Sequence, residues 1–363
     1  MQQSKLEPKL IRMLITDVSH PVTQSTIESL KRTADDKFYI VGIDYTGKYQ
    51  ECSCIDKHYN VDFKGASEYI QTVKDICVRE SIDLVVPWTD DEVFWISSAA
   101  ADFRQMGIAT LCGSHESIKR TVDKGSLLQE LRKTDIPVPD FDLVSSPEET
   151  ELAAYRLGYP DNPVVVKPRR SISGRGLWIL DPNVDLMQQS NRNSITLSSF
   201  LSMLQDVKNN RRKLPDYMIM QYLPGDDYSV DALALSGEAI FVIPRGRVEW
   251  VDGISRICEI LPNPEVRSMV VRIIREFNLH LNVNIQFKYS EIAGGMPLVY
   301  EVNPRVSGTI VANDASGISL FYYGILLALN RKIPPRDSLR ARQLKMIRYW
   351  TESYIYKDEW FEP

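Results

Sequence analysis

The sequence predicts an α/β protein in which an N-terminal domain with a doubly wound parallel sheet precedes two α+β subdomains with antiparallel sheets. A length of 363 residues allows two or three domains. Short apolar runs alternate with helical patterns over residues 10–115, as in parallel sheets covered by helices. Strand patterns dominate the second half, with few crossover helices between them. Antiparallel pairing is therefore expected there.

Residues 1–115 are expected to form a Rossmann-like domain. Apolar spacing predicts helices over residues 26–32 and 69–80. The predicted buried strands are 11–16, 38–43 and 84–87. Ligands bind beyond the carboxyl ends of such strands, so the polar segments 16–20 and 88–92 are candidate site positions. No Gly-x-Gly-x-x-Gly fingerprint follows the first strand, which disfavours a nicotinamide cofactor.

Three segments follow the first domain. Apolar positions at helical spacing predict a connecting helix within residues 116–137, ended by prolines. Residues 138–222 are expected to form one subdomain and 223–363 the other. Their predicted strands are 164–167, 177–180, 217–222, 228–235, 239–244, 282–289 and 298–302, and one helix is predicted at 265–278.

Composition disfavours several classes of function. Apolar residues make up 44% and charged residues 25% of the chain, as in globular proteins. The net charge of -5 provides no basic field for nucleic acid. The longest apolar run, 320–329, is short for a membrane span, and the first ten residues do not resemble a signal peptide. The five cysteines are scattered, so we expect a reduced, cytoplasmic protein without a structural metal cage.

A basic loop at the end of a predicted strand is the first candidate site. Lys167 ends the apolar run at 164–167, and the loop 169–176 adds arginines, serines and two glycines. Backbone N–H groups of such a loop can approach a phosphate closely, and Lys and Arg supply the countercharge. The Walker pattern is absent. The alternative is an ordinary basic surface hairpin.

Two later strands carry oxygen-bearing side chains on one face. Alternation places Gln286 on the same face as Asn284, and Glu301 on the same face as Asn303. If these strands pair, the side chains converge in a set suited to Mg²⁺. Arg305 lies just beyond the strand, where it could clamp a phosphoryl group or an oxyanion. An exposed polar strand face is the alternative.

The third candidate is the turn between the strands 217–222 and 228–235. It carries two adjacent acids, Asp226 and Asp227, which could accept the hydroxyl groups of a ribose. The alternative is a plain turn, in which Asp and Gly are the expected residues.

In this order and spacing, the three pieces resemble the ATP-grasp superfamily, particularly the carbamoyl-phosphate-synthetase-like carboxylate-amine ligases. The resemblance covers nearly the whole chain. Its motifs are Lys167 before the loop, the hinge and acid at 221–228, Asn-x-Gln-Phe at 284–287 and Glu-x-Asn-Pro-Arg at 301–305. The segments 83–92 and 123–124 also look like the family's N-terminal domain and linker. The resemblance implies an ATP-grasp fold with residues 138–222 as its lid.

The resemblance also implies cofactors and site residues, with ATP and Mg²⁺ bound and Mn²⁺ an alternative metal. Lys124 and Lys167 would hold the ATP phosphates, Lys167 being catalytic together with the arginine of the last motif. The loop containing Ser171, Gly174 and Gly176 would close over the phosphates.

The remaining nucleotide and metal contacts are implied in the same way. Gln221 and Leu223 would line the adenine slot, and Asp227 would hold the ribose. Arg305 would contact the transferred phosphoryl group. The implied metal ligands are Gln286, Glu301 and Asn303. The family often has an acid where Gln221 stands, which matters little if that contact is mainly through the backbone.

The substrate pockets have no readable motif. Arg245, Arg247 and Arg256 resemble a substrate-proximal segment of single-unit relatives, with ordinary surface arginines as the alternative. The segment 307–309 could present backbone N–H groups to a carboxylate, or it could simply cap a helix. The acid, the amine and the pathway are left open.

These residues suggest an ATP-dependent carboxylate-amine (or thiol) ligase that works through an acyl phosphate, because such transfer depends on positioning and charge neutralisation. Two alternatives stay open, a nucleotide-binding regulatory protein without turnover and a bicarbonate-using enzyme that forms carbamoyl or carboxyl groups. The expected partners are small-molecule substrates, with no nucleic acid and no membrane. Relatives are often dimers, so a homodimer is one expectation.

Overall fold

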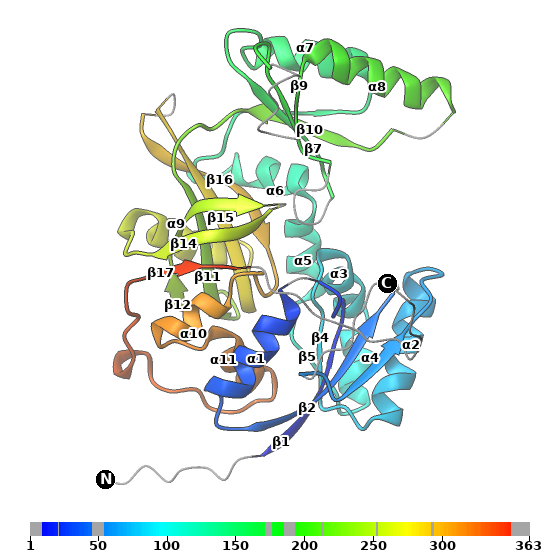
Figure 1. Cartoon of the computed structure of the whole chain (residues 1–363), viewed down its shortest axis with the longest axis vertical. Helices are drawn as coiled ribbons and strands as arrows, with labels where there is room; N and C mark the ends of the chain where they lie inside the picture. The colour runs from blue at the N-terminus through cyan, green and yellow to red at the C-terminus, as the bar shows by residue number, and fades with distance from the viewer. Residues whose placement is uncertain are drawn as a thin grey trace, which may run out of the picture.

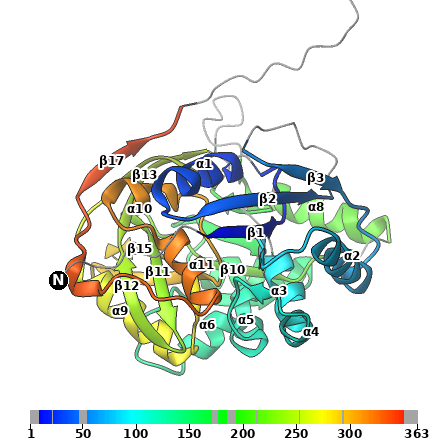
Figure 2. The ribbon, with the colours of Figure 1, turned by 90° about the horizontal axis from the view of Figure 1, so that it is seen from below.

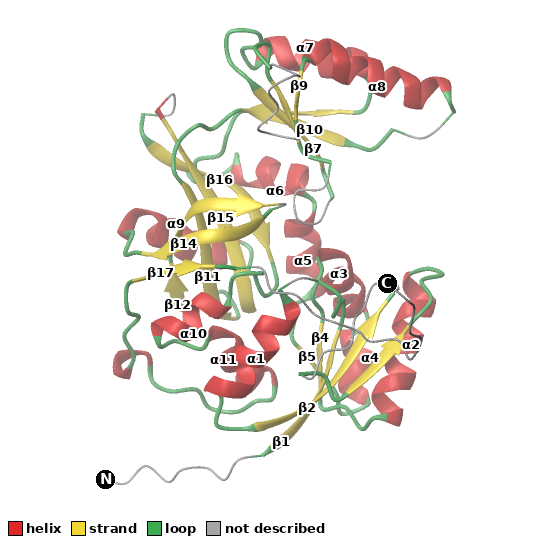
Figure 3. Ribbon diagram, in the orientation of Figure 1, coloured by secondary structure: helices red, strands yellow, loops and turns green. Residues whose placement is uncertain are grey.

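The computed structural model describes residues 9–20, 22–45, 54–170, 176–184, 193–211, 214–251, 253–291 and 294–349 (Figure 1). They form three sheets, each with its own helices. The fold class predicted from the sequence is confirmed, because a parallel sheet comes first and two largely antiparallel sheets follow it (Figure 3).

The N-terminal domain is a five-stranded parallel sheet in the order β3-β2-β1-β4-β5. Its strands are β1 (Leu10–Ile15), β2 (Lys37–Asp44), β3 (Lys57–Asn60), β4 (Leu84–Val86) and β5 (Ala109–Thr110). Its helices are α1 (Thr23–Thr33), α2 (Ala66–Arg79), α3 (Asp90–Ser98) and α4 (Ala100–Gln105). The strand order reverses between β1 and β4, so the carboxyl ends of these two strands flank a crevice suited to a ligand.

The connection between the domains differs from the predicted single helix. It forms two helices, α5 (His115–Val122) and α6 (Lys124–Leu131). Asp123 between them is extended, and its side chain accepts a hydrogen bond from the backbone N–H of Ser126. An Asp in this role caps the second helix and ends the first. The break therefore places Lys124 in the first turn of α6.

The second sheet belongs to the predicted lid segment and has the order β6-β10-β7-β8-β9. Its neighbouring strands are antiparallel except for the parallel pair β8 and β9. Helices α7 and α8 cover its outer side, and its other side faces the rest of the molecule (Figure 3). Its elements are β6 (Phe141–Val144), α7 (Pro147–Arg156), β7 (Val164–Pro168), β8 (Trp178–Leu180), β9 (Ser194–Ile195), α8 (Leu197–Asn209) and β10 (Tyr217–Gln221).

The third sheet has seven antiparallel strands in the order β16-β15-β11-β13-β14-β17, with β12 paired to β11. The strands are β11 (Asp227–Leu235), β12 (Glu238–Ile243), β13 (Arg245–Val251), β14 (Ile254–Ile260), β15 (Leu281–Ser290), β16 (Met296–Asn303) and β17 (Leu344–Ile347). The helices are α9 (Pro264–Glu276), α10 (Val311–Ser316), α11 (Leu320–Ala328) and the short 3₁₀ helix η2 (Arg336–Ser338).

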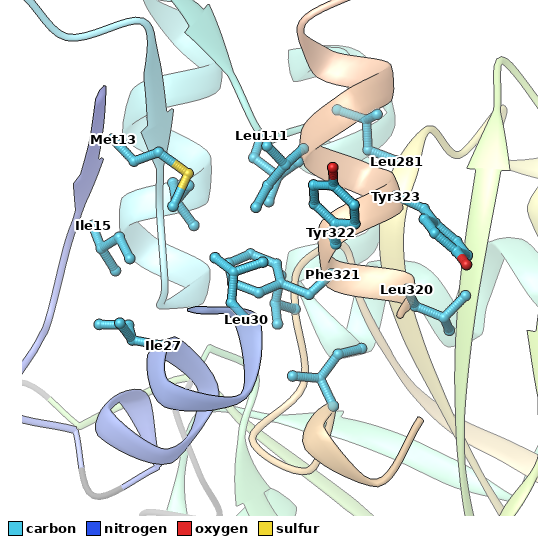
Figure 4. Close-up of a cluster of buried hydrophobic side chains, with 14 of the residues drawn as sticks. Met13, Ile15, Ile27, Leu30, Leu111, Leu281, Leu320, Phe321, Tyr322 and Tyr323 are labelled. Carbon is cyan, nitrogen blue, oxygen red and sulfur yellow. The ribbon is translucent and has the colours of Figure 1, made fainter. Parts of the chain in front are cut away.

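One apolar core joins the first and third sheets. Helix α11 lies between the parallel sheet and strands β11 and β12 (Figure 2). Its Phe321 is buried in one cluster with Met13 and Leu30 of the N-terminal domain and with Leu281 of β15 (Figure 4). Burial of such side chains stabilises the fold by about 1.5–3 kcal/mol each. The N-terminal domain and the large sheet are therefore packed as one unit.

Within the described part of the chain, no helix has the length and apolar character needed to cross a bilayer.

Candidate functional site

The predicted metal ligands lie on two paired strands. Gln286 of β15 stands opposite Glu301 of β16, and Asn284 stands opposite Asn303. Residues two apart on a strand share a face, so the amide of Gln286, the carboxylate of Glu301 and the amide of Asn303 lie on one face of the sheet. The strand pairing that the sequence suggested is therefore present.

A β-bulge adjoins this face. The register shifts between Gln286 and Phe287, which leaves Tyr300 as the extra residue of β16. Bulges re-aim side chains and carbonyl groups. The Tyr300 carbonyl accepts a hydrogen bond from Lys167 Nζ at 3.3 Å, and its hydroxyl donates one to Asp227 at 3.2 Å. Tyr300 thus links the predicted phosphate lysine with the predicted ribose acid. This role could not be predicted, because the bulge has no sequence signature here.

Three cations surround the carboxylate of Glu301. Lys124 Nζ lies 3.5 Å from it, and the charges of Lys124, Lys167 and Arg305 all favour its ionised form. Burial alone would raise the pKa of Glu301, but these cations outweigh burial and hold the pKa below its ordinary value. The site therefore holds a carboxylate anion in a positive environment.

Lys167 is the most strongly perturbed of these cations. It ends β7 and is only 4% exposed. Burial lowers its pKa to about 8, and the charge of Lys124 adds to the effect while Glu301 opposes it. A lysine that is destabilised as a cation in the free protein gains most from an arriving anion.

Arg305 connects the strand end to the N-terminal domain. Its Nε donates to Asp90 Oδ1 at 2.7 Å, and an Nη2 hydrogen bond reaches Asp90 Oδ2 at 3.2 Å. The same Nη2 donates to Asn303 Oδ1 at 3.0 Å, and Nη1 donates to the carbonyl of Val306 at 3.2 Å. A guanidinium has five N–H donors, so one Nη1 hydrogen is left for another acceptor. Asp90 lies in the segment 88–92 that the sequence predicts as a candidate site position, but its pairing with Arg305 has no sequence signal, because no local pattern shows contacts between distant segments.

The donor set fits a magnesium ion. It offers one carboxylate and two amide oxygens, and Mg²⁺ takes such oxygens together with phosphate oxygens and water. Gln286 donates through Nε2 to Asn284 Oδ1 at 3.3 Å, which leaves its Oε1 as an acceptor. No cluster of three His, Cys, Asp or Glu side chains suited to a metal occurs among the residues that the structure describes. The mixed set is therefore the metal candidate in this part of the chain.

The predicted adenine and ribose residues have protein partners of their own. Gln221 accepts a hydrogen bond from the backbone N–H of Asp140 at 3.0 Å through Oε1. Leu223 is 3% exposed, within an apolar cluster. Asp227 lies 3.4 Å from Arg247. Burial raises the pKa of Asp227 although Arg247 opposes the shift.

The predicted phosphate loop is described only in part. Ser171 and Gly174 lie outside the described residues. Gly176 has a φ of 74°, and a Cβ there would lie 2.9 Å from Pro168. Only glycine combines this backbone conformation with so close an approach. Gly176 therefore has a clear role in the backbone of the loop, whatever the loop binds.

The three arginines considered for substrate binding all have carboxylate partners. Arg245 forms a completely buried ion pair with Asp231. Arg247 pairs with Asp227 and donates to the Gly253 carbonyl. Arg256 pairs with Glu249.

Comparisons with known protein families match two parts of the chain. Residues 17–111 match the model described as "PylC-like, N-terminal domain". Residues 213–350 match the model described as "ATP-grasp in the biosynthetic pathway with Ter operon". The second match contains all three predicted metal ligands and the arginine that follows them.

Solved structures resemble most of the described architecture. The biotin carboxylase domain of Hydrogenobacter thermophilus 2-oxoglutarate carboxylase, in complex with MgADP, ADP and bicarbonate, has a TM-score of 0.65 and 16% identity over 91% of this chain and 72% of its own. N5-carboxyaminoimidazole synthetase from Staphylococcus aureus, complexed with ADP, has a TM-score of 0.64 and 13% identity over 91% and 80%. L-amino acid ligase from Bacillus licheniformis has a TM-score of 0.61 and 12% identity over 89% and 75%. At these identities the likeness establishes the fold.

Proposed function

Because the chain belongs to the ATP-grasp superfamily, we propose that it is an ATP-dependent ligase that joins a carboxylic acid to an amine (or thiol) through an acyl phosphate. The observation that carries the proposal is the position of Glu301. This carboxylate stands opposite Gln286 and within reach of Lys124, in a positive environment suited to a metal-bound polyphosphate.

Each group near Glu301 has a role in this proposal. Lys124 and Lys167 bind phosphate oxygens, since their ammonium groups lie beside the Glu301 carboxylate and the Tyr300 carbonyl of β16. Gln286, Glu301 and Asn303 hold Mg²⁺, which supplies charge neutralisation to the phosphates when bound. The remaining Nη1–H group of Arg305 donates a hydrogen bond to the oxygen that gains charge during phosphoryl transfer.

The reaction balances in two steps. A carboxylate oxygen of the acid attacks the γ-phosphorus of ATP, the bond to the β,γ-bridging oxygen breaks, and ADP leaves. The amine then attacks the acyl carbon, its proton is lost, and inorganic phosphate leaves. The chain positions and neutralises the reactants without a covalent link to the protein.

The neighbours named above support small-molecule substrates of this chemical class but do not identify them. Asp227 and the 221–223 hinge are proposed to hold the nucleoside, and Gly176 to shape the loop over the phosphates. A cytoplasmic location and a homodimer are further parts of the proposal. Light scattering of the purified protein tests the dimer, and cell fractionation tests the location.

A phosphate-release screen over pairs of acids and amines with Mg-ATP tests the function. ADP release that requires both an acid and an amine supports the proposal, and mass spectrometry then identifies the product. Release with bicarbonate as the acid points instead to the carboxylating alternative. Binding of Mg-ATP without turnover over the whole panel points to the regulatory alternative.

Glu301→Ala tests the metal assignment in the same assay. We expect turnover to fall to background, because the only carboxylate of the proposed metal set is lost. Glu238→Ala is the control, since Glu238 is an exposed glutamate at the start of β12. Unchanged turnover in Glu301→Ala would reject the assignment.

A further inference from the structure

A row of buried polar side chains leads to the proposed metal site. Its first three members are Asn313 of α10, Asp231 of β11 and Asn284 of β15, and all three are almost completely buried. Each is hydrogen-bonded to the next, and Asn284 in turn contacts Gln286. We call these four residues the hydrogen-bond relay. It runs from a helix that packs on β14 to one of the proposed metal ligands.

The carboxylate of Asp231 fixes the direction of the hydrogen bonds in the relay. An ionised carboxylate only accepts hydrogen bonds, and Arg245 provides its countercharge in a buried ion pair. Asp231 Oδ2 accepts from Asn313 Nδ2 at 2.8 Å, and Asp231 Oδ1 accepts from Asn284 Nδ2 at 2.8 Å. Because the NH₂ group of Asn284 is turned to Asp231, its Oδ1 is turned to Gln286 and accepts from Nε2 at 3.3 Å.

This order decides which atom Gln286 offers to a metal. The two ends of a carboxamide group have nearly the same shape, but only the oxygen can bind Mg²⁺. Gln286 uses its NH₂ group on Asn284, so its Oε1 remains for the metal. A flipped amide would turn its N–H hydrogens toward the cation. The relay therefore holds Gln286 in the orientation that binds a metal.

Packing alone does not explain an asparagine at position 313. The side chain is completely buried, and its Oδ1 has no hydrogen-bond partner within the described ranges. A buried acceptor without a partner is costly, and an apolar side chain would avoid that cost. What Asn313 contributes is therefore its hydrogen bond to Asp231.

Helix α10 holds Asn313 in a defined place. The helix contacts α1 of the N-terminal domain and β14 of the large sheet. Its Asp314 accepts a hydrogen bond from Ser29 Oγ of α1 at 2.6 Å. The backbone carbonyl of Asn313 accepts one from Ser316 Oγ at 2.7 Å and one from the Ile318 N–H at 3.0 Å. The relay therefore begins at a point that both joined domains define.

We propose that Asn313 is a positioning residue that acts through Asp231 and Asn284 to keep the amide oxygen of Gln286 directed at the metal ion. The inference rests on the ligase function and the metal set proposed above. It adds a residue that lies three hydrogen bonds away from the metal ligand on which it acts.

The test measures how much Mg²⁺ the protein needs to bind adenylyl imidodiphosphate, a non-hydrolysable ATP analogue. Calorimetric titrations are made over a series of Mg²⁺ concentrations. We expect the half-saturating Mg²⁺ concentration to rise about 10- to 100-fold in Asn284→Ala, which removes a direct partner of a metal ligand, and about 3- to 10-fold in Asn313→Ala, which acts through two further bonds. At saturating Mg²⁺ the affinity for the analogue should stay within about twofold of the wild-type value, because the metal then fills the site.

Asn282→Ala is the matched control. Asn282 is also a buried asparagine with an unpartnered Oδ1, but its Nδ2 donates to the carbonyl of Leu320 at 2.8 Å, outside the relay. Its Mg²⁺ requirement should equal that of the wild type. Asn313→Leu fills the volume that alanine leaves empty, and it should need as much Mg²⁺ as Asn313→Ala. Thermal melting of each variant checks that it is folded.

Asn313→Ala is also measured in a Gln286→Ala background. If Asn313 acts through Gln286, its replacement should have no further effect on the Mg²⁺ requirement there. A general weakening of the structure would instead add to the loss.

Two results overturn the proposal. The first is a wild-type Mg²⁺ requirement in folded Asn313→Ala or Asn313→Leu. The second is an equal rise of the requirement with and without Gln286. A wild type that binds the analogue equally well with and without Mg²⁺ instead overturns the metal assignment of the proposed function, so the two failures are distinguishable.

Discussion

Replacing Asp90 by Asn tests whether the N-terminal domain positions Arg305 for catalysis. Asp90 begins α3, whose start is fixed by reciprocal hydrogen bonds between Thr89 and Glu92. Its carboxylate accepts two hydrogen bonds from Arg305, at 2.7 and 3.2 Å. Asn has the same shape but one acceptor oxygen and no charge, so the variant keeps at most one of the two bonds.

The magnitude follows from the geometry. The side chains of Arg305 and Asp90 are 15% and 14% exposed, so the pair is largely desolvated. A hydrogen bond to a charged group contributes about 1.5–3 kcal/mol. A loss of about 2 kcal/mol in the orientation of the guanidinium lowers kcat about 30-fold. The KM for ATP should change less than about twofold, because Arg305 is the only proposed phosphate-contacting residue that Asp90 is seen to bind, and its hydrogen bond is expected to strengthen as charge develops during transfer.

The assay is steady-state ADP release with saturating acid and amine. Asp142→Asn is the control, because Asp142 also accepts a hydrogen bond from an arginine Nε, that of Arg156 at 2.5 Å, in an exposed pair at strand β6 of the second sheet. Asp90→Asn is also measured in an Arg305→Ala background. If Asp90 acts through Arg305, it should have little further effect there.

Wild-type kcat in Asp90→Asn would refute the reasoning. So would an equal loss of activity with and without Arg305, since that outcome places the effect of Asp90 elsewhere.

Three further outcomes follow from buried polar groups. Nucleotide affinity should fall as the pH rises above about 8, because the pKa of Lys167 in the free protein is about 8 and the ammonium form is needed to bind phosphate. Calorimetric titrations from pH 7 to 9.5 measure the affinity, and a pH-independent affinity contradicts the prediction. Asp231→Asn should lower the free energy of unfolding by about 3–5 kcal/mol, because it leaves the buried charge of Arg245 unpaired; urea unfolding measures the loss, and a change below 1 kcal/mol contradicts it. Tyr300→Phe removes the hydrogen bond to Asp227 and should weaken nucleotide binding about 3- to 10-fold. Nucleotide titrations that give the variant the same affinity as the wild type contradict this.

The sequence predicted the features that depend on local periodicity. The alternation in 282–288 and 299–303 was enough to place Gln286, Glu301 and Asn303 on one face of two neighbouring strands, and the observed strand register agrees. The parallel sheet followed from apolar runs separated by helical spacing. These signals survive in a single sequence because each depends on residues a few positions apart.

Features that depend on distant contacts could not be predicted. The bulge at Tyr300 arises from the fit between two strands, and the pairing of Asp90 with Arg305 joins segments 215 positions apart. The break at Asp123 was missed for a different reason. The apolar residues keep helical spacing across the break. The side chain of Asp123 accepts a hydrogen bond from the Ser126 backbone N–H, and this cap starts a separate helix, α6.

The contact between Lys124 and Glu301 has a consequence for how the site is filled. The two groups neutralise each other at 3.5 Å, and both side chains are largely buried. If Glu301 turned to a metal alone, Lys124 would lose this ion pair in a largely buried part of the site, which is costly. If the metal arrived together with a polyphosphate, a phosphate oxygen could take the place of the carboxylate beside Lys124. Under the proposed metal assignment, the ion pair of the free site therefore favours binding of the metal–nucleotide complex over binding of the metal by itself.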